Sequence, residues 1–261
     1  LSQFYNYALQ NYKVMELVEP TYEDVENQIK NFDILFCAPN HQTFVIDEDL
    51  IKDSNVKSIL SPSTGLNHID VDSVPIVSVK NDKILNDVWS TAEHTLYLML
   101  SIVRGKHELH EKTLGIIGYG RLGKMVEQLC KPLFQDVICV DEDDDMSLLY
   151  IESDIVSIHI DLNPTTKNLI DNEFLSHFKR NIYLINTARG EVVNEQDIKH
   201  LLSVGRIKGY ATDVLQSEYN GKQSTFDGVE NVIVTPHIAG TSIEAQEKTY
   251  KRVLEKYENI K

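Results

Sequence analysis

The stretch that most constrains the fold is residues 113–141, in which two apolar runs flank a glycine-rich turn. Residues 114–117 suit a buried parallel strand, and residues 137–140 suit a second strand that ends in Asp141. Between them lie the sequence G-x-G-x-x-G, at 118–123, and an amphipathic segment that runs through Leu133. This order of strand, glycine turn, helix, strand and acid is the one that a dinucleotide requires.

Each part of this pattern has a physical role in holding a dinucleotide. The first glycine permits the tight turn, the second lets the backbone approach a pyrophosphate, and the third lets the helix pack close to the strand. The helix N-terminus offers N–H groups to phosphate, and the acid can accept ribose hydroxyls. The alternative is a glycine turn in another kind of α/β unit, which does not require the acid. The predicted cofactor-binding residues of this stretch are Gly118, Gly120, Arg121, Leu122, Gly123 and Asp141.

The acids that follow Asp141 favour one cofactor over another. Residues 142–145 are Glu-Asp-Asp-Asp, and as a group they suit a solvated loop. A 2′-phosphate placed beside Asp141 would meet several negative charges and no arginine. NAD is therefore predicted rather than NADP.

The size and charge of the chain limit its class. With 261 residues, 42% of them hydrophobic, it can bury a sizeable core and is expected to form two domains. The net charge of −15 argues against nucleic acid and anionic membrane as partners, because both need a basic surface. No apolar run is long enough to span a membrane, and residues 1–17 are too polar for a secretory signal. Because residue 1 is leucine rather than methionine, we expect that N-terminal residues precede it.

The three cysteines, Cys37, Cys130 and Cys139, are widely spaced and lack metal-ligand spacing. Each lies in or beside an apolar run, so we expect buried free thiols and no metal site. Free thiols are typical of reducing compartments, which predicts a cytoplasmic protein.

The first third of the chain indicates an α/β unit with its own parallel sheet. Its predicted elements alternate, with a helix over 22–31, a strand over 33–38, a helix over 46–52 and a strand over 58–60. A loop with Ser63, Thr64 and Gly65 follows the last strand, and ligands of open α/β sheets bind at such strand ends. These three residues are candidates to turn backbone N–H groups toward an anion, with an ordinary capped turn as the alternative.

A long helix is predicted over residues 88–104, with Ser90 or Thr91 as its N-cap. Its second half is apolar on nearly every side, so the helix should be buried between domains or subunits. Glu93 and His94 lie near its start, at an expected domain boundary. A single histidine in such a place is more often structural than catalytic.

Three residues with useful chemistry follow predicted strands in the second half of the chain. Arg189 follows a strand over 182–185, Asp213 lies near the exit of a strand over 210–214, and His237 follows a strand over 232–234. The C-terminal ends of strands in one doubly wound sheet share the cofactor crevice. We therefore expect these three side chains to converge there.

At this point the chain resembles the D-isomer-specific 2-hydroxyacid dehydrogenase family over nearly its whole length, most strongly over 61–240. The segments that carry the resemblance are STGLNHID at 63–70, STAEH at 90–94, TLGIIGYGRLG at 113–123, INTARGEVVN at 185–194 and TPHIAG at 235–240. The resemblance implies two Rossmann-like α/β domains with parallel sheets, the cofactor domain being inserted into a discontinuous substrate domain. The implied boundaries are 1–86 for the first part of the substrate domain, 87–237 for the NAD-binding domain and 238–261 for a C-terminal helix that returns to the substrate domain.

The resemblance also implies a catalytic set. Arg189 matches the family's arginine that holds the substrate carboxylate and carbonyl, and His237 matches its general acid/base. The family's third catalytic residue is a glutamate five places after the aspartate that matches Asp213, and this position is Glu218. Tyr219 follows it where family proteins usually have proline.

Further binding residues follow from the same resemblance. The loop of Ser63, Thr64 and Gly65 matches the family's loop that binds the substrate carboxylate through backbone amides. Asp213 matches an aspartate near the nicotinamide, where it would orient the carboxamide. The remaining predicted cofactor-binding residues are Thr187, Ala188, Arg189, His237, Ala239 and Gly240.

The chemistry of these residues suits the reduction of a 2-oxo acid, which needs hydride at C2 and a proton on its oxygen. An arginine can bind a carboxylate and polarise a carbonyl together, and a protonated histidine can donate to the developing alkoxide. The sequence therefore predicts an NAD-dependent oxidoreductase for a small 2-oxo or 2-hydroxy acid. The alternative is an NAD(H)-sensing binding protein of the kind that the family's transcriptional corepressors resemble, some of which keep all three catalytic residues.

The helix at 88–104 bears on two further expectations. The family dimerises through its cofactor domain, so we expect a homodimer in which this helix is largely buried.

In the family an extended arm follows the helix, whereas here Arg104 runs directly into Gly105. The chain is either a compact variant or lacks a segment at this joint, and we favour the second; the joints at 74–75 and 143–146 are also short.

Overall fold

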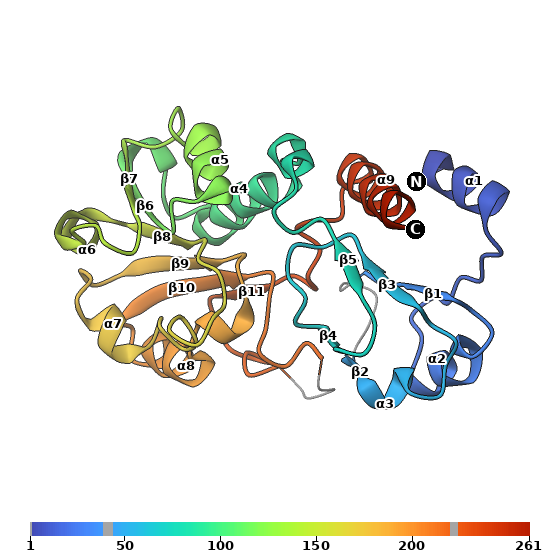
Figure 1. Ribbon diagram of the computed structural model, residues 1–261. Helices are drawn as coiled ribbons and strands as arrows, with labels where there is room; N and C mark the ends of the chain where they lie inside the picture. The colour runs from blue at the N-terminus through green and yellow to red at the C-terminus, as the bar shows by residue number, and fades with distance from the viewer. Residues whose placement is uncertain (1, 39–43, 220–223) are drawn as a thin grey trace. The chain divides into compact units, whose positions relative to one another are not determined.

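The computed structural model describes residues 2–38, 44–219 and 224–261. Its contacts divide the chain into two compact units, and each has its own parallel sheet, as predicted (Figure 1). The first unit holds Leu1–Val88, Glu218–Gly221 and Gly240–Lys261, and the second holds Trp89–Ser217 and Lys222–Ala239. Within the described ranges, none of the helices has both the length and the apolar character that crossing a membrane requires.

The second unit is built on a six-stranded parallel sheet with the strand order β11-β10-β9-β8-β6-β7 (Figure 1). The strands are β6 (Thr113–Ile117), β7 (Asp136–Val140), β8 (Ile155–Ile158), β9 (Ile182–Asn186), β10 (Ile207–Thr212) and β11 (Val232–Val234). The order reverses at β6, which pairs with β7 on one side and with β8 on the other. In a doubly wound sheet such a reversal opens a crevice at the carboxyl ends of the strands.

Helices cover both faces of this sheet, α4 and α5 on one side and α7 and α8 on the other (Figure 1). The helices of this unit are α4 (Ser90–Val103), α5 (Arg121–Cys130), α6 (Ser147–Glu152), α7 (Asn172–Ser176) and α8 (Glu195–Ser203), with the short 3-10 helices η3 (Leu109–Glu111) and η4 (Gly190–Val192). Alternate strand residues supply the two cores: Ile116 and Ile185 pack with α4 and α5, whereas Ile117 and Leu184 pack on the opposite face. Both faces are therefore apolar, as a buried parallel sheet requires.

Three details of this unit differ from the prediction. Helix α5 ends at Cys130 rather than Leu133, because Pro132 has no backbone N–H with which to continue the helical hydrogen bonds. Strand β10 ends at Thr212 rather than Val214, because the Thr212 hydroxyl donates to the Val214 carbonyl and turns the chain out of the sheet. Helix α4 has Trp89 at its N-cap without a side-chain bond, so the expected cap at Ser90 or Thr91 is wrong.

The C-terminal end of α4 closes in a glycine turn. Gly105 has φ +75°, the left-handed conformation that glycine supplies just past a helix. The backbone N–H groups of Lys106 and His107 both donate to the Val103 carbonyl. The helix thus ends across the Arg104–Gly105 joint without an extended arm.

The first unit contains a three-stranded parallel sheet in the order β1-β3-β5 and a separate pair of strands, β2 and β4. The strands are β1 (Ile34–Phe36), β2 (Ile46–Asp47), β3 (Ser58–Ser61), β4 (Ile69–Asp70) and β5 (Ile76–Ser78). The helices are α1 (Ser2–Asn11), α2 (Tyr22–Ile29), α3 (Glu48–Ile51), the 3-10 helix η2 (Lys83–Asp87) and α9 (Ile243–Ile260). The predicted helix over 46–52 is therefore shorter, because its first two residues pair with β4 and Asp47 caps α3 by accepting from the Leu50 N–H.

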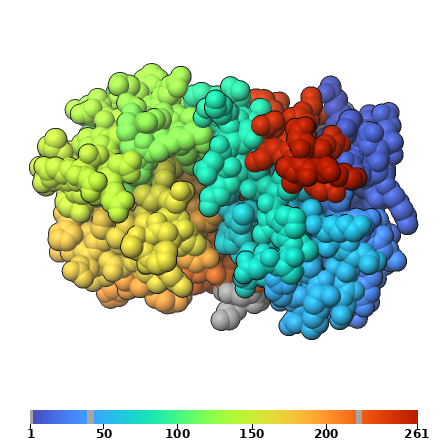
Figure 2. Space-filling view, in the orientation of Figure 1, coloured from blue at the N-terminus to red at the C-terminus, as the bar shows by residue number. Residues whose placement is uncertain are grey.

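The two ends of the chain meet in the first unit. Helix α9, at the C-terminus, lies beside α1, at the N-terminus (Figures 1 and 2). The hydroxyls of Tyr7 and Tyr12 both donate to the Glu258 carboxylate, at 2.9 and 2.8 Å. Helix α9 also buries Val253 and Leu254 in the same core as Leu60 of β3.

Candidate functional site

The six strands of the second unit end level with one another. The ladder pairs side by side the last residues of all six strands, Val140, Ile117, Ile158, Asn186, Thr212 and Val234. The next residue of every strand therefore lies just past the ladder. These six residues, which we call the edge row, are Asp141, Gly118, His159, Thr187, Asp213 and Thr235. The row holds five polar residues and one glycine, at the sheet edge where α/β proteins bind ligands.

The glycine turn at 118–123 meets three different steric demands. Gly118 has φ +91°, and a Cβ on it would lie 2.6 Å from the His159 carbonyl oxygen. A Cβ on Gly123 would lie 2.2 Å from the Gly118 carbonyl oxygen, so only glycine lets α5 pack this close. A Cβ on Gly120 would meet no protein atom within 4 Å. Because Gly120 stands at the N-terminus of α5, this open space is where a phosphate can approach the N–H groups of the helix's first turn.

The flanks of the turn complete a dinucleotide-sized frame. Arg121 and Leu122 form the first turn of α5, and burial lowers the pKa of the Arg121 guanidinium. Asp141 is exposed at the end of β7, two strands from β8, and its backbone N–H donates to the Asp144 carboxylate at 2.8 Å. The Asp141 carboxylate is thus exposed to solvent directly after β7. The residues present fit a dinucleotide.

The turn that carries Arg189 is held by Asn186, the last residue of β9. The buried Asn186 amide donates to the Arg189 carbonyl at 2.9 Å and accepts from the Ala188 N–H at 3.0 Å. Arg189 is half-buried, and its guanidinium donates to the Ala188 carbonyl at 2.5 Å. Next to it, the Thr187 hydroxyl lies 2.8 Å from the Thr95 hydroxyl of α4. Asn186 and Thr95 were not among the predicted site residues, because no local pattern marks them.

Asp213 is 1% exposed and holds the turn that carries His237. One carboxylate oxygen accepts from the Thr235 hydroxyl at 2.5 Å and from the Ile238 N–H at 2.9 Å, and the other accepts from the Ala239 N–H at 2.7 Å. The Asp213 carbonyl accepts from the His237 N–H at 3.0 Å. His237 has φ +53°, which costs a residue with a side chain about 1–2 kcal/mol. The hydrogen bonds to Asp213 offset that cost and fix the direction in which His237 leaves the backbone.

The first unit places the predicted anion-binding loop directly after β3. Ser63, Thr64 and Gly65 are all half-buried there. The Ser63 hydroxyl donates to the Gly65 carbonyl at 2.9 Å and lies 2.7 Å from the Ser61 hydroxyl, which lies 3.1 Å from His68 Nε2. This chain of hydrogen bonds sets the shape of the loop. Ser61 and His68 are fully buried, and neither was among the predicted site residues.

Glu218 and Tyr219 belong to the first unit, whereas Arg189 and His237 belong to the second. Glu218 is half-buried. The ring of Tyr219, which stands where the family usually has proline, lies 6.2 Å from the ring of His68, measured between centroids. Gly240, the last predicted cofactor-binding residue, is exposed at the point where the chain re-enters the first unit.

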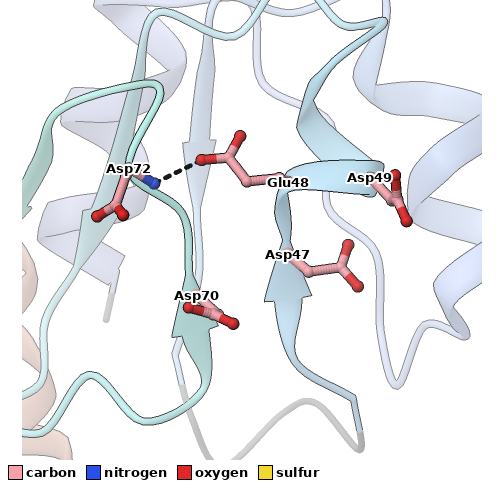
Figure 3. Close-up of a pocket in the computed structure, with 5 residues that line it drawn as sticks. All are labelled: Asp47, Glu48, Asp49, Asp70 and Asp72. Atoms are coloured by element: carbon pink, nitrogen blue, oxygen red, sulfur yellow. Dashed lines mark hydrogen bonds between the residues drawn. The ribbon is translucent and has the colours of Figure 1, made fainter.

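A separate pocket in the first unit is lined by five acids, Asp47, Glu48, Asp49, Asp70 and Asp72 (Figure 3). Its volume is about 270 Å³. Glu48 accepts from the backbone N–H groups of Asp72 and Ser73, and hydrogen bonds from Ser73 and Asp72 lower the pKa of its carboxyl. Five carboxylates repel an anionic substrate, so this pocket does not suit a 2-oxo acid.

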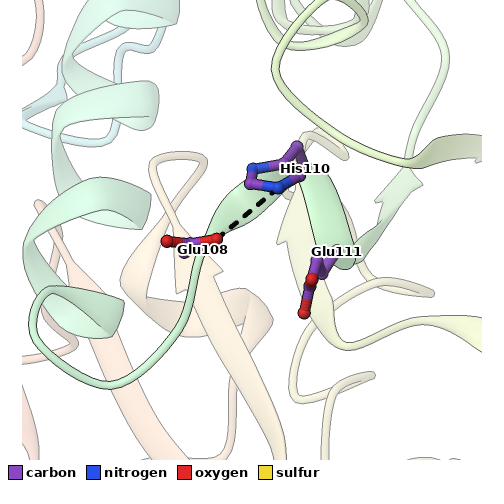
Figure 4. A group of neighbouring side chains, drawn as sticks. All are labelled: Glu108, His110 and Glu111. Atoms are coloured by element: carbon purple, nitrogen blue, oxygen red, sulfur yellow. Dashed lines mark ion pairs between the residues drawn. The ribbon is translucent and has the colours of Figure 1, made fainter.

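One group of side chains has the residue types of a metal site. Glu108, His110 and Glu111 offer ligand atoms that all lie within 4.8 Å of one another, and His110 Nε2 lies 3.5 Å from the Glu108 carboxylate (Figure 4). All three are exposed. They come from one short turn around η3, so chain connectivity alone brings them together, and the group has no buried wall that would define a site.

Comparisons with known proteins place this geometry in a family. Residues 100–239 match the sequence profile of the NAD-binding domain of the D-isomer specific 2-hydroxyacid dehydrogenases. The chain is 32% identical over 270 residues to a glyoxylate reductase of Thermofilum pendens. The aligned region covers 88% of this chain and 78% of that protein. It is 28% identical to a formate dehydrogenase of Candida boidinii, over 85% of this chain and 74% of that protein.

Solved structures share the fold. The crystal structure of a D-lactate dehydrogenase from Aquifex aeolicus, complexed with NAD and lactic acid, matches 99% of this chain and 91% of its own chain with a TM-score of 0.76 at 24% identity. The sheet with its edge row and glycine turn therefore defines an NAD-binding Rossmann domain of a dehydrogenase. The chain belongs to the D-isomer specific 2-hydroxyacid dehydrogenase family.

Two glycines of the turn are expected to respond differently to the same added methyl group. Gly120→Ala should raise the dissociation constant of NADH at least about tenfold, roughly 1.4 kcal/mol, without changing the urea midpoint, because its Cβ meets no protein atom. Gly123→Ala should lower the free energy of unfolding by about 1–3 kcal/mol through its clash with the Gly118 carbonyl. NADH fluorescence titration and urea unfolding measure the two effects. An unchanged NADH affinity in Gly120→Ala would show that the phosphates lie elsewhere.

Asp141→Asn is expected to reduce the preference for NADH over NADPH at least about tenfold in dissociation constant, because the carboxylate that repels a 2′-phosphate is lost. Titrating both cofactors into the variant measures the ratio without any substrate. Asp143→Asn is the matched control, since it removes the same charge from the same exposed loop. Equal changes in the two variants would mean that only the net charge of the loop matters, and that Asp141 does not contact the ribose.

Proposed function

We propose that the protein interconverts a small 2-oxo acid and the corresponding D-2-hydroxy acid, with NAD as cofactor. The observation that supports this most strongly is that Arg189 and His237 each stand two residues past the edge row, after β9 and after β11. Both strands pair with β10, whose own edge residue, Asp213, holds the turn of His237. Arg189, which can bind a carboxylate, and His237, which can transfer a proton, thus both follow strands at the sheet edge where the glycine turn also lies.

Each residue has a defined task in this proposal. NADH, when bound, supplies the hydride for C2 of the 2-oxo acid. Arg189 binds the substrate carboxylate and polarises the carbonyl through its planar fork of donors. His237 donates a proton to the developing alkoxide, and in the oxidative direction its neutral form accepts that proton. Glu218 stabilises the imidazolium and fixes its tautomer.

Two groups of residues hold the cofactor in this proposal. Gly118, Gly120, Gly123 and the first turn of α5, with Arg121 and Leu122, face its phosphates, and Asp141 accepts from the adenosine ribose. Thr187, Ala188, Ala239 and Gly240 surround the nicotinamide. Asp213, which matches the family's aspartate near the nicotinamide, orients the carboxamide in this proposal, and its carboxylate accepts from the Ala239 N–H.

The domain roles follow from these tasks. Residues 1–86 and the C-terminal segment 238–261 form the substrate domain, and residues 87–237 form the NAD-binding domain. In the substrate domain the loop of Ser63, Thr64 and Gly65 turns its backbone N–H groups toward the substrate carboxylate. We also propose a cytoplasmic location, which suits the three free thiols: Cys37 and Cys130 are buried and Cys139 is half-buried.

The alternative function is an NAD(H)-sensing binding protein on the same fold. A panel of glyoxylate, pyruvate and hydroxypyruvate with NADH, and of formate with NAD, separates the candidates. Turnover of a 2-oxo acid to the D-hydroxy acid supports the proposal. NADH binding without turnover of any compound would favour the sensor, and oxidation of formate alone would overturn the 2-oxo acid assignment.

His237→Asn is expected to lower kcat for the best 2-oxo acid by about two to four orders of magnitude, the usual contribution of general acid/base catalysis. The dissociation constant of NADH should change little, because the glycine turn and Asp141 hold the cofactor. Steady-state kinetics and NADH titration measure the two effects. His200→Asn, an exposed histidine on α8, is the control and should retain full turnover. A His237 variant with most of its turnover would contradict the assignment.

A homodimer through the NAD-binding domain is the proposed assembly. The second unit itself buries Leu98, Met99 and Ile102 of α4, so its own core accounts for most of the apolar character of this helix. The side that remains exposed holds Tyr97, 54% exposed, and Leu100, 46% exposed. A second copy of the chain would cover this narrow apolar side.

Tyr97→Lys with Leu100→Glu is expected to convert the dimer to a monomer, because charges would then lie in the apolar contact. Light scattering at about 10 μM measures the mass. Leu148→Glu, which charges a more exposed leucine on α6, should leave the dimer intact. A wild-type protein with the mass of one 29.8 kDa chain would contradict the dimer.

A further inference from the structure

We propose that His94 is a positioning residue for the catalytic histidine. It holds Asp213 and Thr235 in place from the opposite side, and through them it fixes the turn of His237. The inference rests on the role proposed above for His237. It concerns a residue that the sequence marked as structural and that touches neither substrate nor cofactor in the proposed function.

The contacts of His94 are specific. Its Nε2 lies 2.9 Å from the Thr235 hydroxyl and 3.5 Å from the Asp213 carboxylate. The three residues come from α4, from the residue after β11 and from the residue after β10. The imidazole therefore links a helix that packs on the sheet to two neighbouring members of the edge row.

The protonation of this group follows from its hydrogen bonds. The Thr235 hydroxyl has one hydrogen, and it donates that hydrogen to Asp213 at 2.5 Å. Thr235 must therefore accept from His94, which requires the hydrogen of the imidazole to be on Nε2. The hydrogen bonds then run in one direction, from His94 to Thr235 to Asp213.

The surroundings keep His94 neutral. Burial lowers the pKa of the His94 imidazole, and the Asp213 carboxylate opposes that shift. Asp213 is the only charged group among the described residues that acts on it, and the ring of Tyr97 lies 5.4 Å away between centroids. The neutral imidazole, with its hydrogen on Nε2, donates to the Thr235 hydroxyl, and that hydroxyl donates to the Asp213 carboxylate.

The link to His237 passes through the carboxylate. With Thr235 and His94 on one side, Asp213 presents its oxygens to the N–H groups of Ile238 and Ala239, which follow His237 directly. Those bonds hold His237 in its left-handed conformation, φ +53°. Without His94, Thr235 is free to rotate its hydroxyl toward the Thr212 carbonyl, 3.5 Å away, and the carboxylate loses a donor. The turn then becomes looser and His237 leaves its reactive position more often.

Hydrogen exchange of the full-length protein without cofactor or substrate tests this directly. In His94→Leu the Ile238 and Ala239 amides should exchange about tenfold faster, measured by mass spectrometry on peptides that cover 235–240. His94→Gln, whose amide can donate from nearly the same place as Nε2, should restore slow exchange. Thr235→Val should match His94→Leu, and the double variant should be no worse than either single one, because both break the same chain.

Kinetics give the second readout. His94→Leu should lower kcat about tenfold and leave KM for the 2-oxo acid within about twofold, since Arg189 and the loop 63–65 are untouched, and His94→Gln should recover most of kcat. Ala92→Gly, which removes a buried methyl group from the same helix, is the control for simple destabilisation of α4 and should change neither exchange nor kcat. Slow exchange and normal kcat in His94→Leu would overturn the proposal, as would a failure of glutamine to rescue. If no 2-oxo acid is turned over, the function is wrong, but the exchange result still decides the role of His94.

Discussion

The parallel register of the six-stranded sheet is the constraint on which the rest of the second unit depends. Because all six strands end level, one further residue of each strand falls on a common line. At four of these positions, Gly118, His159, Asp213 and Thr235, the backbone N–H still donates to the last residue of the neighbouring strand, so the register also fixes the residues just past the strands. A shift of one strand by a single residue would replace Asp213 or Thr187 with a side chain that points to the opposite face. The register of the strands therefore determines which residues come together at this edge of the sheet.

A buried carboxylate organises the part of this edge that carries the chemistry. Asp213 is nearly inaccessible to water, and a charge in such a place is stable only with several donors. It receives them from Thr235, Ile238 and Ala239, and His94 lies beside it. These hydrogen bonds offset the cost of burying the charge, and they also order the turn in which His237 has its left-handed backbone conformation. The network links α4 to the residues that follow β10 and β11. Asn186 orders the neighbouring turn, which carries Arg189 after β9.

The parts of the fold that could be predicted are those encoded locally. The segment 113–141 contains its own strand, turn, helix and acid, and the structure follows it closely except where Pro132 ends α5 early. The β2–β4 pair was missed and the cap of α4 was wrong because both depend on partners distant in the sequence: Ile46 pairs with Ile69, and the Ser90 hydroxyl donates to the Ala239 carbonyl. The end of β10 depends on a local bond, from the Thr212 hydroxyl to the Val214 carbonyl, that the apolar pattern does not reveal. His94 and Thr235 are 141 residues apart, and only the completed sheet brings them together. The family resemblance supplied Arg189 and His237, whereas Asn186, His68 and His94 became visible as structural supports only from their contacts.

The position of α9 has a consequence for how the protein is made. Helix α9, which has eighteen residues and follows the second unit in the sequence, closes the core of β3 and β5 with Val253, Leu254 and Tyr257. A ribosome releases those residues after every strand of the second unit has emerged, so the second unit can complete its sheet while one face of the first is still uncovered. During that interval Leu60, Val77 and Val79 are exposed to water or to a chaperone. The docking of α9, which two tyrosine hydroxyls bond to α1 through Glu258, therefore covers these residues.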